Sequence, residues 1–269
     1  MNRFTHLGRP IDIRRPSNLF AVAASAVVGV LAFLLAEGEG LDRAWEAVLF
    51  AAAAFLAWAL GREIDPDRHA TATASLVAGG LLAVALDVAA PGAILLVMSA
   101  ARITARTTGL APKVSDLVVA SVVGVVLASD VAGWAGAMIL AFAVVRDATL
   151  PEPAPPHQAW FGAGIAVLAS VSAWTQDAFG SWQTPDLTSW GLIGAGLLGA
   201  AIASQPEPVS STCDLRGEEL HHARIRWARF QTLIAAALAV VVGGADGARG
   251  LAVVWVTLTV AGIIRLTRD

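Results

Sequence analysis

Ten apolar stretches alternate with short polar segments along this chain of 269 residues. They cover residues 19–35, 44–60, 70–86, 92–105, 117–128, 132–145, 160–174, 190–203, 230–242 and 251–264. A helix needs roughly 17 to 25 residues to cross a hydrocarbon core about 30 Å thick, and each stretch approaches that length once its flanking residues are added. The pattern predicts an all-α fold: a polytopic integral membrane helical bundle with about ten transmembrane helices, forming a single domain over residues 1–269.

Two pairs of stretches carry more specific expectations. The third and fourth are separated only by a short segment that contains Asp87 and Pro91, which predicts a helical hairpin. The fifth and sixth, within residues 115–146, reach about 16 residues each with their ends included, or roughly 24 Å at the helical rise. Partial insertion of this pair, or a locally thinned bilayer, therefore stays open.

Positive charge is distributed unevenly between the gaps. Of the 18 Lys and Arg residues, 16 fall in every second gap, and only Arg43 and Arg249 lie in the others. Because cytoplasmic loops carry an excess of Lys and Arg, this asymmetry predicts that both termini are cytoplasmic. The cytoplasmic segments then include an N-terminal arm, residues 1–17, with Arg3 and Arg9, and a long loop, residues 205–229.

The first apolar stretch is long enough to span a membrane, and no A-x-A cleavage site follows it. We therefore expect no cleaved signal peptide and a multi-pass location in a plasma (inner) membrane of the prokaryotic type.

Composition agrees with a lipid environment. Hydrophobic residues make up 57% of the chain and charged residues 14%, whereas soluble domains carry about 25% charged residues. The mean hydropathy is +0.68. We expect membrane lipids as partners and no nucleic acid, and the single cysteine, Cys213, excludes an internal disulfide. The oligomeric state is not predicted.

The densest group of charges follows the second apolar stretch. It comprises Arg62, Glu63, Asp65, Asp67 and Arg68, with Pro66 favouring a turn. Closely spaced carboxylates on a turn are suited to Mg²⁺, so Asp65 and Asp67 are candidate metal ligands and Mg²⁺ a candidate cofactor. Arginines bind phosphate or carboxylate groups in bidentate fashion. The alternative is a solvated loop whose charges pair with one another.

Further candidates occupy the next two cytoplasmic turns. They are Arg102, Arg106 and Asp116 on one turn, and Arg146 and Asp147 on the other. If the helices form one bundle, these side chains and the first group would share a pocket for a phosphorylated or lipid-linked ligand.

Two other patterns predict local structure. In residues 215–230, Leu220, Ala223, Trp227 and Phe230 recur at helical spacing among arginines, which predicts a basic amphipathic helix on the inner leaflet. In the eighth stretch, Gly191, Ala195 and Gly199 recur every four residues, which predicts a face for close helix packing.

Three functions remain open at this level. The first is a membrane-embedded enzyme or binding protein for a phosphorylated or lipid-linked ligand at the cytoplasmic face. The positions of the acidic turns resemble those of UbiA-type prenyltransferases, but Asp65-Pro66-Asp67 replaces that family's Asp-x-x-x-Asp spacing, and its second acidic motif is reduced to Asp147 and Glu152. The second is a transporter, because size and span number are similar to the drug and metabolite transporter group. The third is a noncatalytic scaffold.

Overall fold

The computed structural model describes residues 5–8, 11–37, 39–180 and 182–267, and within them the chain is all-α, without a β-strand. Arg3 and Arg9 of the predicted N-terminal arm lie outside the described residues. The described part forms ten α-helices: α1 (Pro16–Leu35), α2 (Gly40–Ile64), α3 (His69–Leu86), α4 (Pro91–Ala105), α5 (Val114–Leu127), α6 (Val131–Asp147), α7 (Ala159–Thr175), α8 (Leu187–Ala203), α9 (His222–Gly250) and α10 (Ala252–Leu266). A short 3-10 helix, η1 (Pro156–Gln158), precedes α7.

Each predicted apolar stretch coincides with one helix, and local signals set several of the boundaries. Pro16 and Pro91 stand in the first turns of α1 and α4, where a missing backbone N–H costs nothing. The Asp130 carboxylate accepts a hydrogen bond of 2.7 Å from the backbone N–H of Gly133 and caps α6. Helix α5 has 14 residues, which confirms that the fifth apolar stretch forms a short helix.

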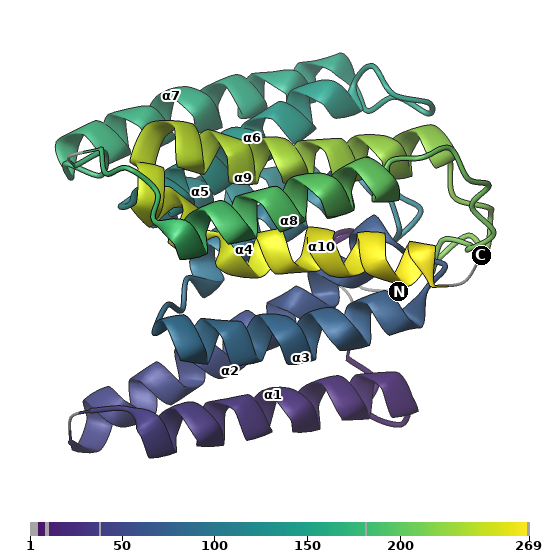
Figure 1. Cartoon of the computed structure of the whole chain (residues 1–269). Helices are drawn as coiled ribbons and strands as arrows, with labels where there is room; N and C mark the ends of the chain where they lie inside the picture. The colour runs from purple at the N-terminus through teal and green to yellow at the C-terminus, as the bar shows by residue number, and fades with distance from the viewer. Residues whose placement is uncertain (1–4, 9–10, 38, 181, 268–269) are drawn as a thin grey trace.

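The helices lie side by side along one common direction (Figure 1). Helices α4, α6 and α9 pack against one another, while α2 and α10 both pack on α3. Around them, α1 packs on α2 and α3, α8 packs on α10 and α9, and α5 and α7 pack on α6.

The predicted hairpin of α3 and α4 is wrong, because α3 packs on α2, α10 and α1, whereas α4 packs on α2, α6 and α9. The connection after Asp87 thus leads from α3, which packs beside α1 and α10, to α4, which packs beside α6 and α9.

One end of the bundle gathers charged side chains, and we call it the charged end. It carries Arg62, Arg102, Arg146 and Arg265, and hydrogen bonds between Arg102 and Glu63 and between Arg106 and Asp147 join the ends of α2, α4 and α6 there. Arg43 and Arg249, the two arginines outside the positively charged gaps, lie at the opposite end. Arg43 donates to the carbonyl oxygens of Phe33 and Leu34, and Arg249 pairs with Asp186. Each has a local partner.

The exterior of the bundle is apolar. Four helices, α1, α2, α3 and α9, are long and apolar enough to cross a membrane, and the shorter α4, α5, α8 and α10 are also apolar. Large hydrophobic side chains such as Val27, Val119, Leu168 and Leu198 are exposed on α1, α5, α7 and α8. A soluble protein rarely exposes apolar patches of this extent, so the structure suggests a membrane protein.

The amphipathic helix predicted for residues 215–230 is not formed as expected. Residues 215–221 are not helical, and α9 begins at His222 and continues to Gly250, with a kink at Gly244, where φ is 57°. The reason lies in the arginines of this segment: Arg224 and Arg229 are 1% and 4% exposed and bind carboxylates inside the bundle. Their side chains connect helices and do not form a lipid-facing polar stripe.

The glycines of α8 pack on a different face from the predicted one. A Cβ at Gly199 would lie 2.4 Å from the carbonyl oxygen of Leu258 in α10, and one at Gly196 would lie 2.3 Å from the ring of Trp255. In contrast, nothing lies within 4 Å of a Cβ at Gly191 or Gly194. Of the predicted trio, only Gly199 lies in the close contact between α8 and α10.

Replacing Gly199 with leucine should destabilise the protein by about 1–3 kcal/mol or more, because the new side chain must separate α8 from the α10 backbone. The midpoint of thermal unfolding in detergent measures this. Gly194→Leu on the same helix is the matched control and should change stability by less than about 0.5 kcal/mol. Equal midpoints for the two variants would contradict the packing.

Candidate functional site

Glu63 joins α2 to α4 at the charged end. Its side chain is fully buried, and Oε1 accepts a hydrogen bond of 2.8 Å from Arg102 Nε, while Oε2 accepts one from the hydroxyl of Thr107. Arg102 also donates to the carbonyl oxygen of Leu7 at 2.9 Å, which ties the N-terminal segment to α4. A buried carboxylate requires such partners, so this pair fixes the relative position of three segments.

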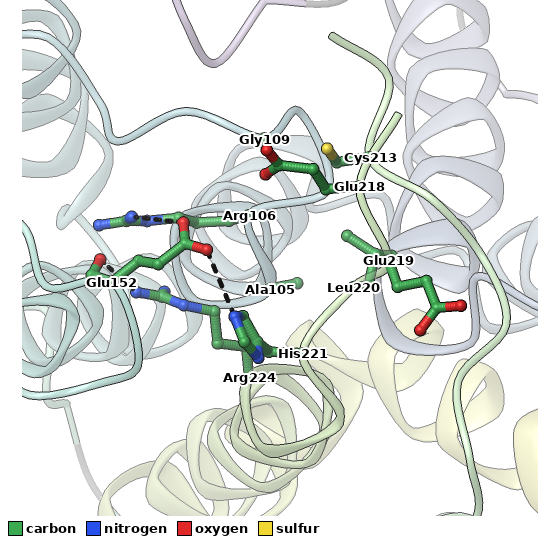
Figure 2. Close-up of a pocket in the computed structure, with 10 residues that line it drawn as sticks. All are labelled: Ala105, Arg106, Gly109, Glu152, Cys213, Glu218, Glu219, Leu220, His221 and Arg224. Atoms are coloured by element: carbon green, nitrogen blue, oxygen red, sulfur yellow. Dashed lines mark hydrogen bonds and ion pairs between the residues drawn. The ribbon is translucent and has the colours of Figure 1, made fainter. Parts of the chain in front are cut away.

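Asp147 joins α6 to α4 and α9. Arg106 donates to both of its carboxylate oxygens, at 3.2 and 3.0 Å, and Arg224 NH1 donates to Oδ1 at 2.7 Å. Arg224 also donates to backbone carbonyl oxygens, including those of Pro151 and Thr104. Figure 2 shows Arg106 and Arg224 beside Glu152, which also binds His221.

A small pocket lies next to this cluster, and Cys213 is one of the residues that line it (Figure 2). The volume of this pocket is about 20 Å³. That volume is close to the space needed for one water molecule, so the pocket is too small for an organic ligand.

Asp65 forms a third buried cluster. It accepts a hydrogen bond of 2.6 Å from the Thr71 hydroxyl and pairs with Arg68 at 3.2 Å and with Arg229 at 3.5 Å. Arg265 lies 3.9 Å from the same carboxylate and 3.0 Å from Glu207. Arg68 also binds Glu207, and this hydrogen bond lowers the pKa of the Glu207 carboxyl although partial burial opposes the change.

Asp67 anchors the segment that precedes α9. Its carboxylate accepts hydrogen bonds from the backbone N–H groups of Ser210 and Ser211, the shortest of them 2.6 Å. Burial alone would raise the pKa of Asp67, but the hydrogen bonds from the two serines together outweigh it and lower the pKa.

The residues suggested for Mg²⁺ do not fit that ion. The carboxylate oxygens of Asp65 and Asp67 are bound by separate sets of hydrogen-bond donors, and those of Asp65 are surrounded by arginines. Within the described ranges, no three His, Cys, Asp or Glu side chains lie close enough together to hold a metal ion. We assign no chemical step to a metal here.

Two further candidates, Asp116 and Arg146, also have structural roles. Asp116 accepts hydrogen bonds from the backbone N–H of Lys113, at the start of α5, and from that of His6. Arg146 lies over the ring of Trp227, 4.3 Å from its centroid. The ten predicted residues therefore share one end of the bundle but form separate clusters and not one pocket.

A cavity at the charged end lies between α1, α2 and α4 and has a volume of about 440 Å³, within the range of small-molecule sites. We call it the α1–α2–α4 cavity. Its polar lining includes Asp12, Arg15, Asn18, Arg62, Glu63 and Arg102, and its apolar lining includes Phe55, Leu56, Trp58, Ala59 and Met98.

The lining separates into a charged part and an apolar part along α2. Arg62 lies over the ring of Trp58, with 5.2 Å between the guanidinium carbon and the centroid, and Phe55 continues the apolar wall. Such a cavity is suited to an amphiphile whose head binds arginine and whose tail contacts aromatic and aliphatic side chains.

Three of the lining residues, Arg62, Glu63 and Arg102, were predicted from the sequence as site residues. No pattern in the sequence indicated that Asp12, Arg15 and Asn18 also line this cavity. The residues before α1 carry charge in the sequence, but only the packing of α1 on α2 brings them beside Arg62.

The chain matches no protein-family model, no curated protein and no solved structure.

Removing the Asp147 carboxylate should destabilise the protein by about 3–5 kcal/mol, because Asp147→Ala leaves the buried Arg106 and Arg224 guanidinium groups without their shared counter-ion. Unfolding in detergent measures the loss. Glu152→Ala is the control: Glu152 is 47% exposed, and the expected change is at most about 1 kcal/mol. A mild effect of Asp147→Ala would show that the cluster does not hold these helices together.

Asp67→Asn should loosen the segment before α9 and raise the rate at which a thiol reagent labels the buried Cys213 by about tenfold. Because the pKa of Asp67 is lowered in the folded protein, its contribution to stability is complete above the ordinary value of about 3.9 and is lost as the pH falls through the lowered value. The bonds are thus intact at neutral pH, where labelling is measured. Asp177→Asn at the opposite end is the control, and equal rates for both variants would refute the anchoring role.

Proposed function

We propose that this protein is a multi-pass protein of a prokaryotic-type plasma membrane, with about ten crossings and cytoplasmic termini, that binds a phosphorylated or lipid-linked amphiphile in the α1–α2–α4 cavity. The topology is supported by the gathering of Arg62, Arg102, Arg146 and Arg265 at one end of an apolar bundle. Since cytoplasmic ends carry the positive charge, the cavity opens at the cytoplasmic face.

One observation carries the binding proposal, namely the amphipathic lining of the cavity. Arg15 and Arg62 supply guanidinium donors at its charged part, and Phe55, Trp58 and Met98 supply its apolar wall. A charge-assisted hydrogen bond contributes about 1.5–3 kcal/mol, roughly twice a neutral one, so the head of an anionic amphiphile is the group that gains most from this site.

A second cavity favours transport as the alternative function. It lies at the opposite end of α1, α2 and α3, has a volume of about 280 Å³ and is lined by Glu37, Glu46, Phe50 and Asp87. Two cavities at opposite ends of α1 and α2 suit a carrier that exposes its ligand to each side in turn. Movement of a labelled amphiphile between the leaflets of proteoliposomes would favour this alternative, and saturable binding without movement would favour binding alone.

The purified protein should bind a fluorescent phosphatidylglycerol, and Arg15→Gln combined with Arg62→Gln should weaken that binding by about tenfold to a hundredfold because two guanidinium donors are lost. Fluorescence titration in detergent measures the Kd. The matched control is Arg14→Gln with Arg226→Gln, which removes two exposed charges from the same end and should leave the Kd nearly unchanged. Absent binding, or equal losses in both double variants, would overturn the proposal.

A further inference from the structure

The side chain of Asn18 has one hydrogen-bonding atom without a partner among the described residues. Asn18 lines this cavity from the first turn of α1 and is only 7% exposed. Its Nδ2 donates to the carbonyl oxygen of Asp12 at 3.0 Å, but its Oδ1 is buried and has no hydrogen-bond partner among the described residues. Native proteins pair nearly all such atoms, so this one requires an explanation.

The orientation of the amide is determined by its other contact. A carbonyl oxygen accepts hydrogen bonds and cannot donate them, so the atom that faces the Asp12 carbonyl must be the amide nitrogen. The oxygen is therefore the atom that remains without a partner. As an acceptor, it can bind only a group that carries a hydrogen-bond donor, such as a hydroxyl or an ammonium group, and it cannot bind an ionised phosphate.

The charged residues around Asn18 point to the same ligand chemistry. Arg15 precedes Asn18 by three residues, and Arg15 and Arg62 both line the cavity that Asn18 lines, so donors for an anionic group share this cavity with the amide. The carboxylates of Asp12 and Asp214 also line the cavity. A rim with both signs of charge and a neutral acceptor is better matched by a head that combines an anion with a donor than by an anion alone.

We propose that Asn18 determines headgroup specificity, and that the ligand is an amphiphile whose head carries a phosphate together with a hydroxyl or ammonium donor. This inference rests on the proposed function and adds the donor. The phosphate binds at Arg15 and Arg62, and the donor binds Asn18 Oδ1.

Paired lipids with identical acyl chains test the donor directly. Phosphatidylglycerol is compared with phosphatidylpropanol, which has the same phosphodiester without the two hydroxyls, and phosphatidylethanolamine is compared with phosphatidylpropanol in the same way. The wild-type protein should bind at least one of the donor-bearing lipids about tenfold more tightly than phosphatidylpropanol. In Asn18→Leu this preference should disappear, so that the donor-bearing lipids and phosphatidylpropanol bind with about the same Kd.

Ser25→Ala is the matched control. Ser25 lies on the same helix and its hydroxyl is also buried without a partner, but it does not line the cavity, so this variant should keep the wild-type preference. If Asn18→Leu does not fold, equal affinities of these lipids for the wild-type protein still overturn the role of Asn18.

The outcomes separate the two proposals. If no phosphodiester lipid binds, the proposed function is overturned. If the lipids bind with equal affinity, as they would if solvent satisfied Asn18 Oδ1, or if the preference survives in Asn18→Leu, only the role of Asn18 is overturned.

Discussion

The pairing of buried carboxylates with arginines is the constraint on which this structure depends most. Glu63, Asp65 and Asp147 are each no more than 1% exposed, and each binds at least one arginine from another helix. Apolar helices in lipid can slide and rotate at low cost, because one aliphatic surface resembles another. A buried charge without its partner is expensive, so these pairs define the register of α2, α4, α6 and α9 at the charged end.

The α1–α2–α4 cavity follows from that arrangement and from the position of α1. Helix α1 packs on α2 and α3, where a Cβ at Gly29 would lie 2.9 Å from the carbonyl oxygen of Ala47, but it does not pack along α4. The Glu63–Arg102 pair holds α4 against α2, so the space between α1 and α4 remains open at the charged end. The same arginines that anchor the topology thus stand beside an apolar wall, where they can bind a ligand.

The sequence predicted the helices well because the length of each apolar stretch is a local property. It failed where long-range packing decides: α3 and α4 do not form a hairpin, and Gly196 packs where Ala195 was expected. The candidate residues lie together at one end of the bundle, as the alternation of stretches predicted, but no spacing in the sequence shows that Arg102 binds Glu63 or that Asn18 joins Arg62 in a cavity. Residues 215–230 were predicted to form a basic helix on the inner leaflet, whereas Arg224 of this segment is buried with Asp147, because periodicity does not reveal a buried counter-ion.

An experimental map of the purified protein in lipid nanodiscs tests the central claim most directly. The account predicts elongated density in the α1–α2–α4 cavity, with a head within hydrogen-bonding distance of Arg15 or Arg62 and a tail along Phe55 and Trp58. A cavity that contains only separate water peaks, or one that is closed by contact between α1 and α4, would contradict it.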